Sequence, residues 1–349
     1  MEGKMRVGLT PKIRTIEYEV RDIPKPKPNE VLVKILHVGV CGSDLHFYEF
    51  GHHGTAEAKF PMVLGHESAG KVVEAGSAVK GLKVGDKIAL EPGIPCGKCE
   101  FCRGGRYNLC PDVYFMACPG IEGSFAEYMT WPEEMCFKLP DKMDTIEGAM
   151  IEPLNVGLHT ARMSEAKPGK TATILGSGCI GLCTLLSLKA SGVAEIYVVD
   201  VIEKRLNKAK ALGATAVINA KQTDGIAKAL ELTGGRGTDI VVDSAGTLQT
   251  AQQTVALLKR GGIITLVGMS NEPLIPLDLA TTLEKEGRVQ TLFRYCNLYP
   301  AGIDLVSSGF IPVKEIVTDY YNFNNLQEGL NFNLDNKTDV VKMVIEFDD

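Results

Sequence analysis

The stretch TATILGSGCIG, residues 171–181, decides the fold of the second half of this chain. A short apolar run leads into a G-x-G-x-x-G pattern, and a helix-length stretch, Ile180–Ser191, follows it. Gly176 would permit a tight turn, Gly178 would let the backbone approach a pyrophosphate, and Gly181 would let helix and strand pack closely. Because the pattern follows a predicted strand and opens a predicted helix, it indicates a dinucleotide-binding turn.

The next segment indicates which dinucleotide is bound. Asp200 ends the apolar run Ile196–Asp200, where an acid that binds the ribose is expected. Its carboxylate can accept hydrogen bonds from the ribose hydroxyls and would repel a 2′-phosphate, so the sequence favours NAD over NADP. Arg205 is a nearby cation that could help to bind either cofactor. Cys179 and Ile180, at the helix start, complete the predicted cofactor site, and a glycine turn beside a surface Asp is the alternative.

Around this motif, strand and helix candidates alternate, which predicts a parallel, doubly wound sheet over residues 157–293. The strand candidates of this region are Thr171–Leu175, Ile196–Asp200, Ala216–Asn219, Asp239–Asp243, Ile263–Val267 and Val289–Phe293. Residues 1–156 instead hold short apolar runs separated by Gly and Pro, such as Val31–Leu36 and Lys87–Leu90, as in a barrel-like β body. Val340–Phe347 reads as a strand that could return to this body, which would make residues 294–349 part of the first domain.

Composition excludes several classes of function. Hydrophobic residues make up 45% of the 349 residues and charged residues 23%, as in an ordinary globular protein. The net charge of -6, without a Lys/Arg stripe, disfavours a nucleic-acid partner. No apolar run reaches the roughly 18–20 residues that span a bilayer, and the first residues lead into no signal-peptide core. We therefore expect a cytoplasmic protein with no membrane association.

Four of the ten cysteines are clustered as Cys96-x2-Cys99-x2-Cys102-x7-Cys110. Two-residue spacings let thiolates converge on one tetrahedral ion, and four sulfurs leave no open coordination position. The cluster therefore predicts a structural zinc that ties down a loop with little core of its own. Disulfides, free buried thiols and an iron–sulfur cluster are the alternatives.

A more dispersed group predicts a second, catalytic zinc. Cys41 follows a predicted strand, and His66-Glu67 begins another, so the chain offers one sulfur, one imidazole nitrogen and one carboxylate. Glu152, near the domain junction, adds a carboxylate. Such a shell leaves a position for water or a substrate oxygen, whose pKa the ion would lower. A buried Cys, a core His and a surface Glu are the separate alternatives.

These residues resemble one known family, the zinc-containing medium-chain dehydrogenases. The chain is similar to the zinc signature of that family position by position, through Gly65-His66-Glu67, then Gly70, Gly76 and Val79. Within the family it looks most like the polyol branch, the sorbitol and xylitol dehydrogenases, on the segments Cys41–His46, Ile151–Gly157 and Phe293–Asn297. The resemblance covers essentially the whole chain and implies a GroES-like β domain, a Rossmann domain and a homotetramer.

The resemblance also implies roles for residues near the catalytic zinc. Glu152 replaces the cysteine ligand of simple alcohol dehydrogenases and would reach the metal directly or through water. Ser43 matches the hydroxyl residue that passes on the substrate proton, and His46 matches the relay histidine of alcohol dehydrogenases. Whether Glu67 binds the metal at every stage is open, because Glu152 or water could exchange with it.

The implied substrate pocket uses four further side chains. Arg294 and Tyr295 would approach the polar substrate or its bound water, and Phe115 resembles an apolar wall of the polyol pocket. Phe47 stands where some sorbitol dehydrogenases carry Tyr, so one hydroxyl is missing from the pocket rim.

The sequence thus predicts reversible, zinc- and NAD-dependent oxidation of a secondary alcohol in a polyol, sorbitol or xylitol, to the ketose. The same chemistry on L-threonine, 2,3-butanediol or a sugar alcohol phosphate is the nearest alternative. The alternatives from other functional classes are a non-catalytic NAD-binding structural protein and a zinc module that binds nucleic acid.

Overall fold

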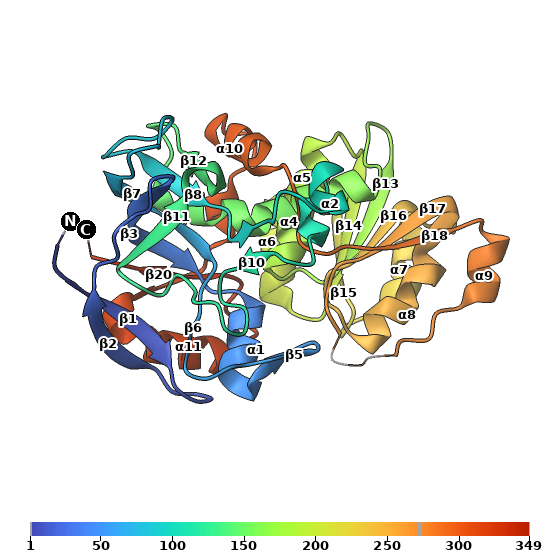
Figure 1. Cartoon of the computed structure of the whole chain (residues 1–349). Helices are drawn as coiled ribbons and strands as arrows, with labels where there is room; N and C mark the ends of the chain where they lie inside the picture. Colours follow the sequence, from blue (N-terminus) through green and yellow to red (C-terminus); the bar gives the residue numbers. More distant parts are fainter. Residues whose placement is uncertain (1, 271, 273, 349) are drawn as a thin grey trace. The chain divides into compact units, whose positions relative to one another are not determined.

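The computed structural model describes residues 2–270, 272 and 274–348. The chain forms two compact units, of which the first contains residues 1–152 and 299–349 and the second contains residues 153–298. In Figure 1 the blue N-terminal and the red C-terminal segments both belong to the first unit.

The strands of the first unit are β1 (Lys4–Thr10), β2 (Glu17–Asp22), β3 (Glu30–Gly39), β4 (His52–His53), β5 (Ala56–Glu57), β6 (Met62–Val63), β7 (Glu67–Ala75), β8 (Lys87–Leu90), β9 (Gly93–Ile94), β10 (Tyr114–Phe115), β11 (Tyr128–Pro132), β12 (Cys136–Lys138), β19 (Asp319–Asn322) and β20 (Met343–Glu346). Its helices are α1 (Gly42–Phe50), α2 (Glu100–Arg103), α3 (Thr145–Ala149), α10 (Tyr299–Ser307) and α11 (Leu326–Asp335).

The strands of the second unit are β13 (Thr171–Leu175), β14 (Glu195–Asp200), β15 (Ala216–Asn219), β16 (Thr238–Asp243), β17 (Leu258–Leu266) and β18 (Arg288–Thr291). Its helices are α5 (Cys179–Ala190), α6 (Glu203–Ala211), α7 (Gly225–Leu232), α8 (Leu248–Leu257) and α9 (Leu279–Glu284), and α4 (Ile151–Met163) begins at the end of the first unit.

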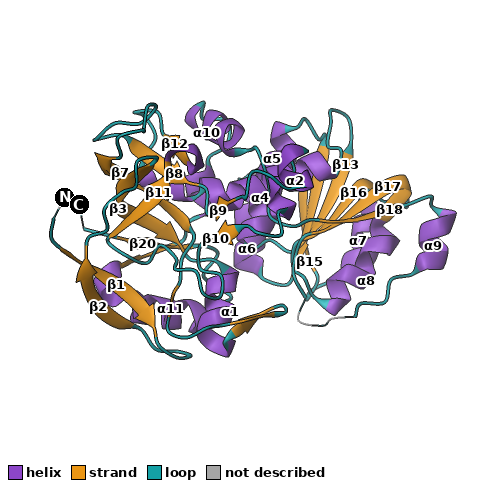
Figure 2. Ribbon diagram, in the orientation of Figure 1, coloured by secondary structure: helices purple, strands orange, loops and turns teal. Residues whose placement is uncertain are grey.

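The second unit is built on a six-stranded parallel sheet with the order β15-β14-β13-β16-β17-β18. Counted along the chain this is 3-2-1-4-5-6, so the predicted doubly wound sheet is confirmed. Right-handed connections place α5 and α6 on one face and α7 and α8 on the other, as Figure 2 shows. The central strands are covered on both faces, which explains why β13 and β16 read as apolar runs without alternation.

The first unit is built around β3, which is the centre of a seven-stranded sheet. The order of that sheet is β12-β8-β7-β3-β20-β19, and β11 also pairs with β3. Val31, Val33 and Ile35 of β3 are fully buried and pack into the core of this unit. A second sheet has the order β2-β1-β6. Short antiparallel strands around one core explain the β-rich reading of the N-terminal sequence.

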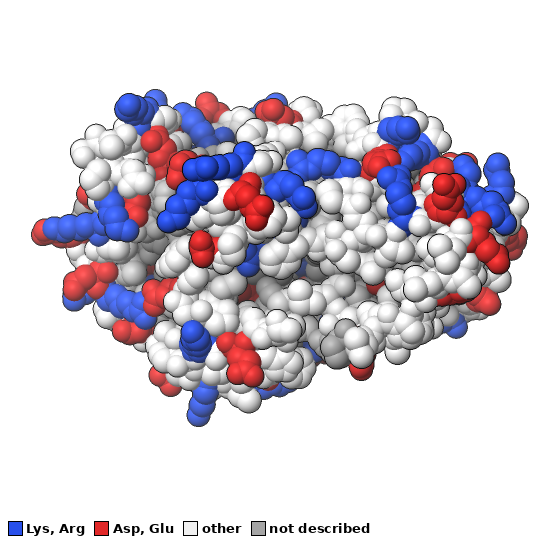
Figure 3. Space-filling model, turned by 45° about the vertical axis from the view of Figure 1, so that its right-hand side comes forward, with Lys and Arg blue, Asp and Glu red and all other residues white. Residues whose placement is uncertain are grey.

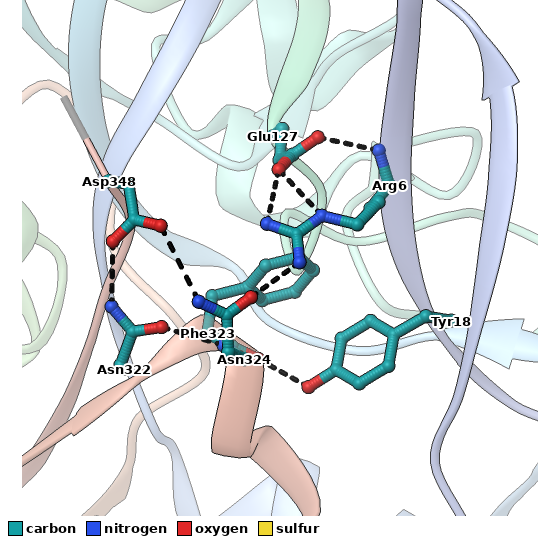
Figure 4. Close-up of polar contacts among 7 residues, drawn as sticks. All are labelled: Arg6, Tyr18, Glu127, Asn322, Phe323, Asn324 and Asp348. Carbon is teal, nitrogen blue, oxygen red and sulfur yellow. Dashed lines mark hydrogen bonds and ion pairs between the residues drawn. The ribbon is translucent and has the colours of Figure 1, made fainter.

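The C-terminal segment completes the first unit, because β20 pairs antiparallel with β3 and places Val344 opposite Gly39. Figure 4 shows the polar contacts that hold the chain nearby. Nε of Arg6, in β1, donates to Glu127 at 2.9 Å, and the guanidinium also donates to the side chain of Asn324. Nδ2 of Asn324 in turn donates to Asp348 at 3.4 Å, so this amide connects the last described residue to the first strand.

Two surface properties bear on the kind of partner. Within the described ranges no helix has both the length and the apolarity to cross a membrane. On the face drawn in Figure 3, acidic and basic side chains lie side by side instead of gathering into a stripe of one sign. This mixture agrees with the modest net charge of -6.

Candidate metal and cofactor sites

The four predicted structural ligands lie together on one loop of the first unit. The sulfurs of Cys96, Cys99, Cys102 and Cys110 are all within 4.8 Å of one another. Sγ of Cys102 is 3.4 Å from that of Cys99 and 4.0 Å from that of Cys96, and none of the four forms a disulfide. Zinc–sulfur bonds of about 2.3 Å imply sulfurs about 3.8 Å apart in a tetrahedron. The group therefore fits one tetrahedral ion.

The acidity of these thiols supports the same conclusion. Backbone N–H groups of Lys98 and Cys99 lower the pKa of Cys96 to about 6. Burial and the neighbouring thiols raise the pKa of Cys102 to about 12. The loop therefore favours the thiolate of Cys96 and opposes that of Cys102, and a divalent cation would let both sulfurs carry charge.

The predicted catalytic ligands come from two neighbouring strands of the same unit. Cys41 is the N-cap of α1, just after β3, whereas Glu67 is the first residue of β7 and His66 precedes it. The β3–β7 register places Gly39 opposite Glu67. As a result, one sulfur, one nitrogen and one oxygen lie within 4.8 Å of one another, a donor set that suits a zinc ion with an open position.

Gly39 makes room for this arrangement. A Cβ atom at this position would lie 2.1 Å from Oε2 of Glu67 and 3.0 Å from Cε of Lys342. A side chain here would therefore displace the carboxylate that completes the donor set. Sequence reasoning assigned Gly39 no role, and only the strand register reveals why glycine stands there.

Lys342 is a second residue that the sequence analysis missed. Its Nζ forms an ion pair with Oε2 of Glu67, and the two side chains are 3% and 1% exposed. Nζ also donates to the carbonyl oxygen of Val40 at 3.0 Å. A buried carboxylate requires such a partner. No local signal could identify Lys342, because it lies 275 positions (342 − 67) from Glu67 in the chain.

Asp44 orients the histidine of the donor set. It is buried, accepts hydrogen bonds from the backbone N–H groups of Gly65 at 2.9 Å and Cys41 at 3.0 Å, and its Oδ1 lies 3.4 Å from Nδ1 of His66. Burial opposes ionisation of both groups, but their mutual attraction and these donors lower the pKa of Asp44, and Asp44 and Cys41 raise the pKa of His66. An acid that holds one ring nitrogen directs the other toward a metal. In the sequence, the place of Asp44 as the third residue of α1 was the signal that could have identified it.

Other predicted residues of the first unit lie near this group or within the core. The ring of Phe115 is 5.8 Å from that of His66. Nδ1 of His46 is 3.4 Å from Nδ1 of His53, and Ser43 lies in the first turn of α1. Phe47 is buried in the core. The ring contact with His66 thus places Phe115 beside the donor set.

Glu152 is the second residue of α4 and is 6% exposed. It does not belong to the group of three donor atoms within 4.8 Å of one another. A role for Glu152 as a direct or water-mediated ligand stays a prediction.

The second unit holds the predicted Arg294 and Tyr295. Arg294 has a positive φ of 53° and its Cζ lies 4.8 Å from the ring centroid of Phe293. Tyr295 is buried. Their predicted approach to a substrate stays a prediction.

The glycine turn has the geometry that its pattern predicts. Gly176 has a φ of 98°, and a Cβ at Gly181 would lie 2.1 Å from the carbonyl oxygen of Gly176. Gly178 is the N-cap of α5, so Cys179 and Ile180 form the first turn of this helix. The turn thus places backbone without bulky side chains beside the N-terminus of α5, an arrangement that suits a pyrophosphate.

Asp200 is fixed beside this turn. Oδ2 of Asp200 accepts from the backbone N–H of Ser177 at 2.5 Å and from its hydroxyl at 2.7 Å, while Oδ1 accepts from Val201 and Ile202. Nη1 of Arg205 would be 3.8 Å from a Cβ at Gly178. The carboxylate and the cation therefore both lie at the glycine turn.

The glycine turn and the two donor groups define the class of protein, a metal- and dinucleotide-dependent oxidoreductase. Two family descriptions match the chain: the alcohol dehydrogenase GroES-like domain over residues 27–141 and the zinc-binding dehydrogenase over residues 179–308. The GroES-like and Rossmann organisation is thereby confirmed.

Individual proteins are similar over nearly the whole chain. An uncharacterized zinc-type alcohol dehydrogenase-like protein of Escherichia coli, YdjJ, is 46% identical over 96% of both chains. Sorbitol dehydrogenase of Bacillus subtilis is 38% identical over 98% of this chain and 97% of its own, and a probable D-xylulose reductase A of Aspergillus clavatus is 38% identical over 90% of both. The chain belongs to the zinc-containing medium-chain dehydrogenase family, and its resemblance to the polyol branch is confirmed.

Solved structures agree with this assignment. An Escherichia coli oxidoreductase of unknown specificity, involved in membrane biogenesis, has a TM-score of 0.96 at 43% identity, over 99% of this chain and 100% of that one. A zinc-binding dehydrogenase from Sinorhizobium meliloti, bound to NADP, has a TM-score of 0.89 at 29% identity, over 99% of both chains. Zinc and a nicotinamide cofactor are therefore family properties, and the choice between NAD and NADP needs a separate argument.

Proposed function

We propose that this chain is an NAD-dependent zinc polyol dehydrogenase, which reversibly oxidises a secondary alcohol of sorbitol or xylitol to the ketose. The observation that carries the proposal is the gathering of Cys41, His66 and Glu67 within 4.8 Å. This mixed donor set leaves a coordination position for a substrate oxygen. Full-length similarity to a sorbitol dehydrogenase and to D-xylulose reductases supports the choice of polyol.

Each protein group near the metal would have a separate task. Zinc, once bound, supplies Lewis acidity that lowers the pKa of the alcohol. Asp44 holds the His66 ring, Lys342 balances the charge of Glu67, and Phe115 offers an apolar surface beside the histidine. These contacts fix the donor atoms before the substrate arrives, which is how a site gains from preorganisation.

Proton removal and substrate orientation would involve the remaining predicted residues. Ser43 would accept the alcohol proton and His46 would carry it toward solvent. Glu152 would exchange with water or with Glu67 at the metal, and Arg294 with Tyr295 would bind the further hydroxyl groups of a neutral polyol. The resemblance to the polyol branch supports these roles.

The choice of NAD rests on Asp200. Its carboxylate is held by the Ser177 backbone and hydroxyl at the end of β14. A fixed negative charge favours ribose hydroxyls and repels a 2′-phosphate. We expect kcat/KM with NAD to exceed kcat/KM with NADP. Asp200→Ser should lower the ratio of these two values by at least about tenfold, because the loss of a charge repulsion of about 1.4 kcal/mol corresponds to that factor.

The test is a panel of initial rates of NADH formation with zinc-replete protein. The panel contains sorbitol, xylitol, L-threonine, 2,3-butanediol and galactitol 1-phosphate. Fastest turnover on sorbitol or xylitol would support the proposal, whereas another substrate would keep the chemistry and change its target. Absence of turnover on all five, with NAD bound, would favour a non-catalytic NAD-binding protein. The homotetramer implied by the resemblance and the cytoplasmic location expected from the composition stay predictions.

A further inference from the structure

Glu91 is a buried carboxyl that the proposed function does not use. It directly follows β8 and is 3% exposed. In the antiparallel β7–β8 pair Ser68 lies opposite Leu90. Continuing this register by one residue places Glu91 across from Glu67, and residues opposed in this way have Cα atoms about 4.5–5.5 Å apart. Glu91 is therefore a cross-strand neighbour of a proposed metal ligand.

The same end of the sheet also lies near Glu152. Helix α3, which ends just before Glu152, packs against β7 and β8. Gly148 lets α3 approach closely, because a Cβ there would lie 2.9 Å from Cβ of Ala69. Burial, with a further contribution from the charge of Glu152, raises the pKa of Glu91 to about 7. The two carboxyls thus influence each other electrostatically.

The four-cysteine loop fixes the carboxyl of Glu91. Tyr107 lies between the third and fourth cysteines, and its hydroxyl donates to Oε1 of Glu91 at 2.8 Å. The backbone of Glu91 is held separately, since Nε1 of Trp131 donates to its carbonyl oxygen at 2.8 Å and its own N–H donates to Met135 at 2.9 Å. The main chain is therefore positioned by the β body, and the carboxyl is positioned by the loop.

We propose that Tyr107 is a positioning residue of the catalytic metal site: its hydroxyl fixes the Glu91 carboxyl and so couples the four-cysteine loop to the metal at Cys41, His66 and Glu67. A buried carboxyl that loses a hydrogen-bond donor must find another polar partner. Glu67, which would bind the metal, lies across from Glu91 when the β7–β8 register is continued by one residue. Without the hydroxyl, the freed carboxyl competes with the ligands and loosens the ion.

The inference rests on the proposed ligand roles, and its test uses metal release, which needs no substrate. The protein carries Co²⁺ at the catalytic site and Zn²⁺ at the four cysteines, and a chelator removes the Co²⁺ while its visible absorption is followed. The variant is Tyr107→Phe, which removes one oxygen and keeps the ring. The matched control is Tyr114→Phe, at a tyrosine that is 49% exposed and packs against Trp131 with ring centroids 6.2 Å apart.

We expect Tyr107→Phe to release Co²⁺ about tenfold faster than the wild type, the lower range for loss of an outer partner of a metal site. Tyr114→Phe should release it at the wild-type rate. If the effect passes through Glu91, the double variant Tyr107→Phe/Glu91→Gln should release Co²⁺ at the rate of Glu91→Gln, because no carboxyl remains to be freed.

Wild-type release by Tyr107→Phe would overturn the inference, and so would an equal acceleration in the Glu91→Gln background. Glu91→Gln alone is expected to release Co²⁺ at the wild-type rate. Faster release from this variant would overturn the inference even if Tyr107→Phe does not fold, because it would show that Glu91 itself supports the metal. Lack of turnover on every polyol would reject the proposed function but would leave these release rates unaffected.

Discussion

The two groups of candidate metal ligands in the first unit are assembled in opposite ways. The four cysteines lie on one loop, within fifteen consecutive positions (96 to 110), whereas Cys41, His66 and Glu67 are brought together by the pairing of β3 with β7. The second group also depends on Gly39 and on Lys342 from the C-terminal segment. A local site can be read from spacing, but a dispersed site depends on strand register and on distant residues.

The largest expected effect is a loss of activity when a ligand of the dispersed group, and not of the four-cysteine group, is removed. Cys41→Ser or Glu67→Ala removes a ligand of the open site and should lower kcat/KM by more than about a hundredfold, which exceeds the usual cost of losing an outer partner. Metal content should fall from two ions to one, because the four cysteines are untouched. Near-wild-type turnover with an intact fold would show that the zinc assignment is wrong.

Gly39→Ala tests the register argument without touching a ligand. The new Cβ would collide with the Glu67 carboxylate at 2.1 Å, so we expect loss of the catalytic ion and a decrease in turnover of about tenfold or more. Gly42→Ala is the control, since a Cβ there meets nothing within 4 Å. Equal metal content in both variants would contradict the account.

Cys102→Ser should lower the stability of the protein more than its activity. Loss of a structural ligand weakens the binding of an ion that stabilises the fold. We therefore expect the free energy of unfolding to decrease by about 3–5 kcal/mol. Activity of the molecules that remain folded should decrease far less than in Cys41→Ser. Full retention of stability with loss of turnover would reverse the assigned roles of the two sites.

Lys342→Met tests the remote support of the dispersed site. It leaves a buried carboxylate without its ion-pair partner, which typically costs about 3–5 kcal/mol. The loss should be smaller when zinc is bound, because the metal offers Glu67 another positive partner. Denaturant unfolding of zinc-loaded and metal-stripped protein measures both values, and equal losses would argue that Glu67 does not contact the metal.

The smallest expected effect is a pH dependence in β3. Nδ1 of His37 lies 2.7 Å from the Thr145 hydroxyl, and burial lowers the pKa of His37. The unfolded state therefore binds the proton more tightly, and stability should fall as the pH decreases below about 6.5, the ordinary pKa of histidine. Urea unfolding of the wild type and of His37→Gln at pH 7.5 and pH 5.5 isolates this contribution. The free energy of unfolding should decrease more in the wild type than in the variant, and an equal decrease in both would contradict the prediction.

The sequence predicted the parts whose physics is local. The glycine turn, Asp200 at the end of its strand, and the four cysteines are short patterns in which spacing alone brings the groups together. The parallel sheet followed from alternating apolar runs, although β18 ends at Thr291, where we had expected a strand to Phe293. Arg294, three residues after this strand, has a positive φ, which an extended strand does not have.

The support of the dispersed site could not be predicted. Lys342 and Gly39 both act on Glu67, which strand pairing brings to them from far away in the sequence. Asp44 is an exception, because its place three residues after Cys41 could have marked it as a helix-capping acid near the histidine. Non-local partners require the register, and a register is fixed by packing as a whole.

Graded removal of metal, with turnover measured on the same samples, tests the central claim most directly. The dispersed site offers three donor atoms, which would leave a bound zinc one open position, whereas four sulfurs would close the other site. A chelator should remove one ion first, turnover should fall in proportion to that ion, and added Zn²⁺ should restore it, while the second ion leaves only on unfolding. Turnover that survives complete loss of the first ion would contradict the account.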